Sequence, residues 1–343
     1  MASTDPPQGP PATLHMPLRM ERISLEKVWG GRALERVLGV ELDREGPVGE
    51  TWELVDRGEE NSVVRGGPFD GQPLRDLVAT EREALLGETR TNEDGRFPVL
   101  IKFISASQPL SVQVHPDDRS AKRLHAGECG KTESWYILDA EPGSLVYLGL
   151  QADVDMAAFG AVAAGPGVVD MLQPWPARAG QFVHIPAGTL HAIGEGITLL
   201  EVQQNSDVTF RLYDWGRRGL DGKPRETHVD KALLAINYEQ PIPGPIEPEY
   251  ESSGGDNRMA ELVDCEHYTM TLHEVGSHVE LETEGRARAL VVVGGSARLW
   301  IGDEHEPMAL ETGDTWLIPA ALGPFRVESE GELVRLIAVD TKT

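Results

Sequence analysis

The chain has 343 residues and a formal net charge of -25, because 56 aspartates and glutamates outnumber 31 lysines and arginines. A field of that sign repels nucleic acid and anionic lipid, so we expect neither as a partner. Two cysteines, Cys129 and Cys265, are too few for a disulfide framework and indicate a reducing compartment. The sequence shows no secretory signal and no apolar run of about 20 residues, which predicts a cytoplasmic protein without a membrane span.

The length predicts two domains, and the chain divides accordingly. Residues 1–20 are rich in proline and small polar residues and predict a disordered tail. Residues 21–240 contain short β-rich runs separated by glycine and proline, among them FPVLIKFI, LSVQVH, ESWYIL and QFVHIP. This spacing is typical of an all-β sandwich or barrel. Helical patterns are few and lie at residues 73–87, at 117–126 behind an Asp cap, and at 154–175.

A Pro-rich, then Ser/Gly-rich segment at residues 241–258 predicts a linker before a second domain at 259–343. The second domain echoes the first. GQFVHIPA at 180–187 and GDTWLIPA at 313–320 share a glycine, four residues and Ile-Pro-Ala. Each follows a strand that opens on glycine, so we expect two copies of one β-unit.

The two copies differ in the residues that could bind a cation. Aligned on the shared Ile-Pro-Ala, His191 of the first copy falls opposite Pro324, and the preceding strands set Glu133 opposite Arg288. The first copy is therefore expected to carry the functional site. The second is expected to be structural or to form an interface.

Polar side chains gather in the first copy. In LSVQVHPDD, Gln113 and His115 lie two residues apart, hence about 6.5 Å along one face of a strand. Lys131 and Glu133 share a face of GKTESWYI, and His191 follows a Pro-Ala-Gly turn. Two imidazoles, a carboxylate and an amide oxygen suit a divalent transition metal, of which zinc fits best, and an open coordination position would make the site catalytic.

Arg211 adds a cation to this set. It alternates with Phe210 and Leu212 in TFRLYDW and so points with polar neighbours. Near a metal, an inward arginine indicates capture of an anion or stabilisation of charge on oxygen, while an ion pair with Asp207, Asp214 or Glu201 is the alternative. The remaining histidines are interpreted as structural: His125, His184, His228, His267, His273, His278 and His305.

Four motifs together, SVQVHPDD, GKTESWYI, IPAGTLHAIG and LLEVQQNSDVTFRLYDWGR, resemble the short bacterial form of the type I mannose-6-phosphate isomerases. The resemblance runs from about residue 20 to the C-terminus. It implies a mainly β protein with two cupin-type jelly-roll β-barrels in tandem and a few helices, the first (21–240) catalytic and the second (259–343) free of metal. It also implies one zinc ion per chain and Arg211 as the active-site arginine, with the metal ligands Gln113, His115, Glu133 and His191.

The activity implied by the resemblance is the interconversion of mannose 6-phosphate and fructose 6-phosphate. Such an aldose-ketose isomerisation moves a proton between neighbouring carbons through a cis-enediol, whose negative charge Arg211 can stabilise. Lys131 is the first candidate for the base; Glu201 is the second, or a substrate contact. Ser111 is the candidate hydrogen-bond donor to the phosphate.

Three alternatives stay open from the sequence. The protein could isomerise a related free or phosphorylated sugar, or bind sugar without catalysis. A cupin oxygenase is disfavoured because Gln113 stands where a His-x-His iron site has its first histidine. The chain is expected to act as a monomer or homodimer.

Overall fold

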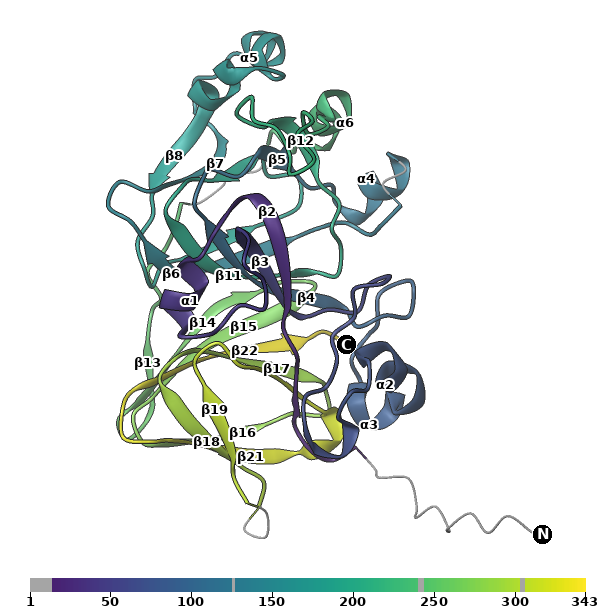
Figure 1. The fold of residues 1–343 in the computed structure, drawn as a ribbon, viewed down its shortest axis with the longest axis vertical. Coiled ribbons are helices and arrows are strands. Elements are labelled where there is room, and N and C mark those ends of the chain that lie inside the picture. Colours follow the sequence, from purple (N-terminus) through teal and green to yellow (C-terminus); the bar gives the residue numbers. More distant parts are fainter. Residues whose placement is uncertain (1–13, 125–126, 240–243, 303–305) are drawn as a thin grey trace, which may run out of the picture.

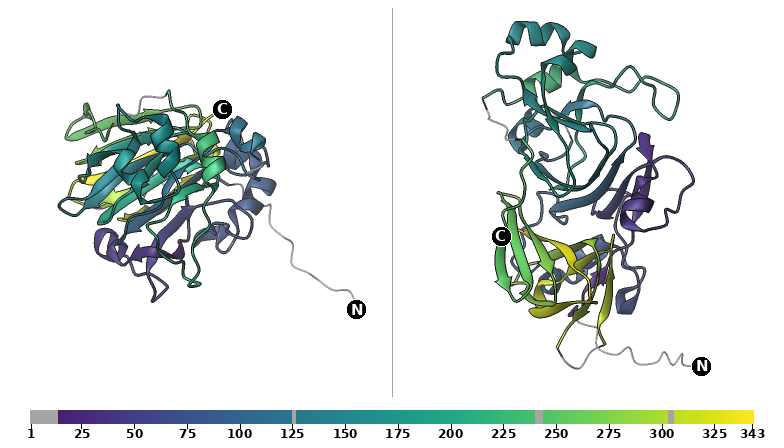
Figure 2. Two further views of the ribbon diagram at one scale, coloured as in Figure 1. Left: turned by 90° about the horizontal axis from the view of Figure 1, so that it is seen from above. Right: turned by 90° about the vertical axis from the view of Figure 1, so that its left-hand side faces the viewer.

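The computed structural model describes residues 14–124, 127–239, 244–302 and 306–343. The chain is mainly β, as predicted, and its strands form four sheets. Two sheets build a first unit and two build a second, stacked along the long axis of the molecule (Figure 1; Figure 2, right). The two sheets of each unit are separate ladders, so each unit is a two-sheet sandwich rather than a closed barrel.

The first unit contains a six-stranded and a five-stranded sheet. The six-stranded sheet has the order β2-β3-β4-β11-β6-β9, with bounds Ile23–Gly31 (β2), Val48–Leu54 (β3), Val99–Ala106 (β4), Glu133–Ala140 (β6), Phe182–Ile185 (β9) and Ile197–Gln204 (β11). The five-stranded sheet has the order β12-β5-β10-β7-β8, with bounds Val112–Val114 (β5), Leu145–Leu150 (β7), Leu172–Pro176 (β8), His191–Ile193 (β10) and Phe210–Tyr213 (β12). Side chains of both sheets share one apolar cluster that includes Trp135, Leu148 and Ile193.

The second unit repeats this plan. Its seven-stranded sheet has the order β1-β20-β17-β22-β15-β14-β13, with bounds Leu18–Arg19 (β1), Glu251–Gly254 (β13), Asn257–Asp264 (β14), Tyr268–Val275 (β15), Arg288–Gly294 (β17), Thr315–Ile318 (β20) and Val334–Thr341 (β22). Its four-stranded sheet has the order β16-β21-β18-β19, with bounds His278–Glu282 (β16), Ser296–Trp300 (β18), Met308–Glu311 (β19) and Pro324–Ser329 (β21). An apolar cluster fills the space between them.

The six-stranded sheet of the first unit packs against the seven-stranded sheet of the second. One continuous buried cluster joins Leu200 and Val202 on β11 to Tyr268 and Met270 on β15. Burial of apolar surface on this scale makes the contact between the units part of the folded core.

The helices of the described residues are short. Their bounds are Ala33–Leu38 (α1), Leu74–Thr80 (α2), Arg82–Leu86 (α3), Asp118–Arg123 (α4), Met156–Val162 (α5) and Val229–Ala235 (α6), with 3-10 turns at Gly67–Phe69, Pro166–Met171 and Ala320–Leu322. The helical predictions at 73–87 and 117–126 are confirmed by α2, α3 and α4. The prediction at 154–175 is confirmed only in its first part, because α5 is followed by a 3-10 turn and residues 172–175 belong to β8. Helices α1 and α6 were not anticipated. Asp117 caps α4 by accepting from the amide of Ser120. No helix in the described ranges is long and apolar enough to cross a membrane.

Two segments differ from the prediction of disorder or linker. The predicted tail ends earlier than residue 20, because Leu14, Leu18 and Met20 are buried and β1 pairs with β20 of the second unit; residues 1–13 lie outside the described residues. In the predicted linker, β13 pairs with β14, so its second half forms the sheet edge. Residues 240–243 at its start are not described.

Strand pairing agrees with the predicted repeat. Glu133 pairs with Ile185 where β6 meets β9, and Arg288 pairs with Ile318 where β17 meets β20. These are the positions that the alignment set opposite one another. In the second unit Arg288 forms an ion pair with Asp340 on β22. The position equivalent to Glu133 is therefore occupied by a cation that already has a partner.

Candidate metal centre

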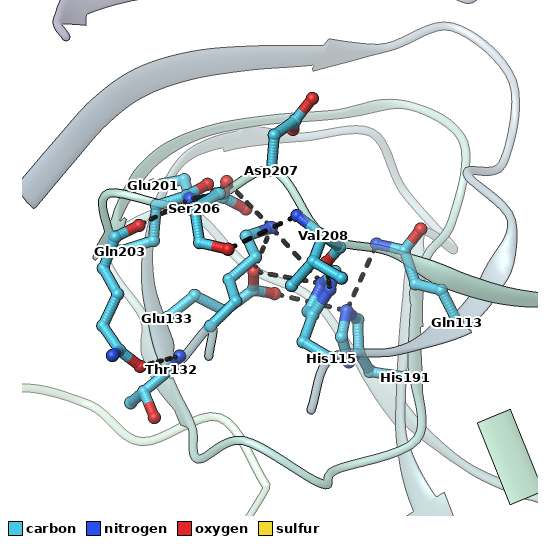
Figure 3. Close-up of polar contacts among 12 residues, drawn as sticks. Gln113, His115, Thr132, Glu133, His191, Glu201, Gln203, Ser206, Asp207 and Val208 are labelled. Carbon is cyan, nitrogen blue, oxygen red and sulfur yellow. Dashed lines mark hydrogen bonds and ion pairs between the residues drawn. The ribbon is translucent and has the colours of Figure 1, made fainter. Parts of the chain in front are cut away.

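Three buried side chains from both sheets of the first unit meet between those sheets. His115 follows β5, Glu133 opens β6 and His191 opens β10, and one candidate ligand atom of each lies within 4.8 Å of the others. Figure 3 shows the Glu133 carboxylate facing both imidazoles. Its Oε1 is 3.2 Å from Nε2 of His191, and its Oε2 is 3.4 Å from Nε2 of His115.

Backbone carbonyls orient both imidazoles. Nδ1 of His115 lies 2.6 Å from the carbonyl oxygen of Val208, and Nδ1 of His191 lies 2.9 Å from that of Thr189. When Nδ1 donates to a carbonyl, Nε2 keeps a free lone pair directed at the centre. Burial lowers the pKa of His191 to about 4, and burial together with the neighbouring Lys131 lowers the pKa of His115. Both rings are therefore neutral near pH 7, as a ligand must be.

The residues present fit a divalent metal ion. Oε1 of Glu133 is buried without a hydrogen bond, while its Oε2 is paired with Lys131. Lone-pair atoms approach one another at 3.2 and 3.4 Å in this cluster. In a tetrahedral zinc site with bonds of about 2.0–2.1 Å, ligand atoms are separated by roughly 3.3–3.4 Å. The spacing and the unsatisfied Oε1 both match what such an ion would need.

Gln113 lies beside this cluster as the register partner of His191. Its Oε1 accepts from Ser111 Oγ at 2.9 Å, while its Nε2 is 3.3 Å from Nε2 of His191. An amide nitrogen has no lone pair for a metal. A half-turn of the amide would bring the oxygen to the same position, so Gln113 is within reach of the centre.

Lys131 lies between two carboxylates. Its Nζ is 2.6 Å from Glu133 Oε2 and 3.6 Å from Glu201 Oε1. Burial alone would lower the pKa of Lys131, but Glu133 and Glu201 outweigh it and the pKa is raised. Glu201 is held by the indole of Trp135, which donates at 3.0 Å, and by Lys102 at 3.4 Å.

A pocket of about 280 Å³ opens beside the cluster, and its lining includes Ser111, Gln113, Lys131, Glu201 and Arg211. Sequence reasoning had singled out all five. Six further charged or ionisable residues line the pocket and were not predicted as pocket residues: Lys27, Glu50, Lys102, Asp207, Arg225 and His228. A lysine inside the apolar run FPVLIKFI was the signal that could have found Lys102, which is only 2% exposed.

Arg211 is in the pocket and forms none of the ion pairs considered from the sequence. Its Nη1 donates to the carbonyl oxygen of Glu226 at 2.7 Å, and its Nε is buried without a partner. Asp214 is paired with Arg217 and Arg225 instead. Burial, with the nearby Arg225, lowers the pKa of Arg211 to about 10, so the guanidinium keeps its charge at neutral pH.

Two of the histidines interpreted as structural form hydrogen bonds near the site. His228 lines the pocket, where its Nδ1 accepts from the backbone amide of Arg211 at 3.3 Å. His184 is hydrogen-bonded to Ser134 at 2.9 Å, as expected for a structural group. His125 and His305 lie outside the described residues.

Comparison with known proteins gives consistent matches. A model of the phosphomannose isomerase type I catalytic domain matches residues 18–146, and a model of the mannose-6-phosphate isomerase cupin domain matches residues 258–338. The mannose-6-phosphate isomerase of Streptococcus mutans is 32% identical over 93% of this chain and 97% of its own length. The mannose-6-phosphate isomerase ManA of Bacillus subtilis is 33% identical over 93% and 98%.

A crystal structure of the mannose 6-phosphate isomerase from Bacillus subtilis matches with a TM-score of 0.84 and 30% identity, covering 94% of this chain and 99% of that one. These matches identify a cupin-domain protein built from two related β-units. More narrowly, the chain belongs to the type I phosphomannose isomerase family.

Proposed function

We propose that the protein is a zinc-dependent isomerase that interconverts mannose 6-phosphate and fructose 6-phosphate through a cis-enediol. The observation that carries the proposal is the buried cluster of His115, Glu133 and His191 beside a pocket lined with cations. These three residues would hold one zinc ion per chain, with Gln113 as a fourth ligand after a half-turn of its amide. The ion would supply Lewis acidity toward the oxygens of the open-chain sugar.

The charge around the pocket supports a phosphorylated substrate. In a chain with a net charge of -25, five cationic side chains line this one pocket: Lys27, Lys102, Lys131, Arg211 and Arg225. Lys27 and Lys102 share the carboxylate of Glu50, at 3.2 and 3.8 Å. Ser111 stands in the same lining and would donate a hydrogen bond to the phosphate.

The other lining groups suit the proton transfer. The guanidinium of Arg211 would stabilise negative charge that develops on a substrate oxygen. The base that takes the proton from one carbon and returns it to the next would be Lys131 or Glu201, whose Nζ and Oε1 are 3.6 Å apart. Lys131 has a raised pKa and would have to lose its own proton before it could act as the base. Both reach the pocket, so either can meet the substrate. Replacing each in turn, with exchange of the substrate C2 proton into solvent as the readout, assigns the base.

Metal analysis of the purified protein, with isomerase assays before and after chelation, tests the proposal. We expect zinc near one equivalent per chain, activity that is lost on chelation, and recovery on adding zinc. Full activity in metal-free protein would refute the zinc dependence. Equal turnover of mannose and mannose 6-phosphate would favour an isomerase of free sugars, and binding without turnover would favour a non-catalytic cupin.

The proposal also covers the domains of the chain, its location and its partners. We propose residues 21–240 as the catalytic domain and 259–343 as a metal-free cupin-like domain. Cys129 and Cys265 are free thiols, which supports a reducing, cytoplasmic location. The acidic charge supports a protein that does not bind nucleic acid. We also propose that the protein acts as a monomer or homodimer.

A further inference from the structure

A tyrosine of the second unit reaches into the first unit behind the metal cluster. Tyr268, the first residue of β15, is fully buried. Its hydroxyl donates to the carbonyl oxygen of Val202 at 3.0 Å and is hydrogen-bonded to Ser134 Oγ at 3.0 Å. The bonds thus join a side chain of one unit to two neighbouring strands, β11 and β6, of the other.

Tyr268 contacts β6 and β11 next to the residues that carry the buried carboxylates, Glu133 and Glu201. Ser134 on β6 and Val202 on β11 are register partners. Each directly follows a site residue in the sequence: Ser134 follows Glu133, and Val202 follows Glu201. Successive side chains of a strand point to opposite faces. Ser134 and Val202 therefore face the second unit, while Glu133 and Glu201 face the metal cluster and the pocket.

Ser134 extends the connection to a third strand. Its Oγ also lies 2.9 Å from Nδ1 of His184 on β9, opposite Ser134 in register. A hydroxyl can donate once and accept twice, so one chain of polar contacts runs from β9 through Ser134 and Tyr268 to β11. In a buried setting such a network fixes geometry, since every broken bond leaves an unsatisfied polar group.

We propose that Tyr268 is a positioning residue of the metal centre, through which the second unit anchors the paired strands β6 and β11 and hence holds Glu133 in position. This inference rests on the proposed function, because it assumes that zinc binds at His115, Glu133 and His191. It gives the second unit a part in the reaction, although that unit has lost the cation-binding residues itself.

Tyr268→Phe tests the inference, because it removes the hydroxyl and keeps the ring in the core between the units. We expect zinc affinity to fall about 10-fold, the lower end of what is lost with outer hydrogen bonds that orient ligands. The visible absorption spectrum of the cobalt-substituted protein, which reports ligand geometry, should shift. The kcat should fall by a similar factor while KM stays within about twofold, because the pocket cations other than Lys131 lie in segments outside β6 and β11.

Tyr136→Phe is the matched control. Tyr136 is buried at the same contact between the units, and its hydroxyl makes no hydrogen bond with any described residue. We expect this variant to retain wild-type zinc affinity and cobalt spectrum. Ser134→Ala removes the other partner of the hydrogen bond between Tyr268 and Ser134 and should weaken zinc binding as Tyr268→Phe does. The double variant should bind zinc no more weakly than the single variant with the lower zinc affinity.

The outcomes separate cleanly. If the wild type binds zinc and Tyr268→Phe binds it equally well with an unchanged cobalt spectrum, the inference is wrong, even if the variant unfolds at a lower temperature. Equal losses in Tyr268→Phe and Tyr136→Phe would also overturn it, since they would reflect packing alone. A wild-type protein without zinc affinity would remove the proposed function and this inference with it.

Discussion

Replacing Glu133 with glutamine probes the charge at the centre of the site while keeping the shape of the side chain. The carboxylate is fully buried and contacts three groups: Nζ of Lys131 at 2.6 Å and Nε2 of His191 and His115 at 3.2 and 3.4 Å. The substitution would therefore perturb two properties at once. It would leave Glu201, at 3.6 Å, as the remaining carboxylate paired with Lys131, and it would remove the negative charge among the proposed zinc ligands.

The expected magnitudes follow from these contacts. Removing one partner of a buried ion pair costs about 3–5 kcal/mol, so metal-free Glu133→Gln should lose roughly 3 kcal/mol in free energy of unfolding. Loss of an outer hydrogen bond to a metal ligand already weakens metal binding about 10- to 100-fold. Loss of the charged ligand should exceed roughly 100-fold, which corresponds to about 2.7 kcal/mol.

Urea denaturation of metal-free protein and zinc titration against a competing chelator measure the two effects. Glu53→Gln is the matched control, because Glu53 is 2% exposed and bonds Arg22 at 2.7 Å, outside the pocket lining. It should lose stability without losing zinc affinity. If Glu133→Gln binds zinc within threefold of the wild type, the assignment of Glu133 as a ligand is refuted.

Three further predictions concern the pocket and acid stability. Lys131→Met should lower kcat at least about 100-fold with little change in KM; steady-state kinetics near wild-type values would remove Lys131 from the proton transfer. Arg225→Met should raise KM for mannose 6-phosphate about 10-fold and leave turnover of free mannose unchanged, and equal effects on both sugars would exclude a phosphate contact. Burial lowers the pKa of His184, His191 and His273 from 6.5 to about 4, so unfolding takes up protons in this window. Urea titrations of metal-free protein should show stability falling as pH drops from 6.5 to 4, by at most about 1.4 kcal/mol per pH unit for each histidine, and a flat profile would contradict these buried, neutral rings.

Local patterns predicted the proposed ligands well. Alternation in LSVQVH put Gln113 and His115 on one face, and the structure brings them to the same site as Glu133 and His191. The comparison of the two copies identified which unit carries the cluster, since Arg288 occupies the place of Glu133. These predictions needed only the period of a strand and the order of the residues.

The misses share a cause. Lys27, Lys102 and Arg225 are single cations in unrelated segments, and nothing local marks them as neighbours. The position of His228 beside Arg211 was also not predicted, because it depends on the segment after β12 folding back so that the His228 amide donates to the carbonyl oxygen of Arg211 at 2.7 Å. Residues 14–20 were included in the predicted disordered tail, yet their apolar side chains are buried and β1 pairs with β20 of the second unit.

The amino-acid sequence by itself determined the mainly β class, the repeat, and the face on which each proposed ligand stands, because side-chain alternation is a property of consecutive residues. Only the tertiary structure decided which distant cations share the pocket, why Lys131 has a raised pKa, and how Tyr268 meets Ser134 across the two units. Those features depend on the packing of sheets against one another. That packing is set by the buried surface of the whole molecule and by no single segment.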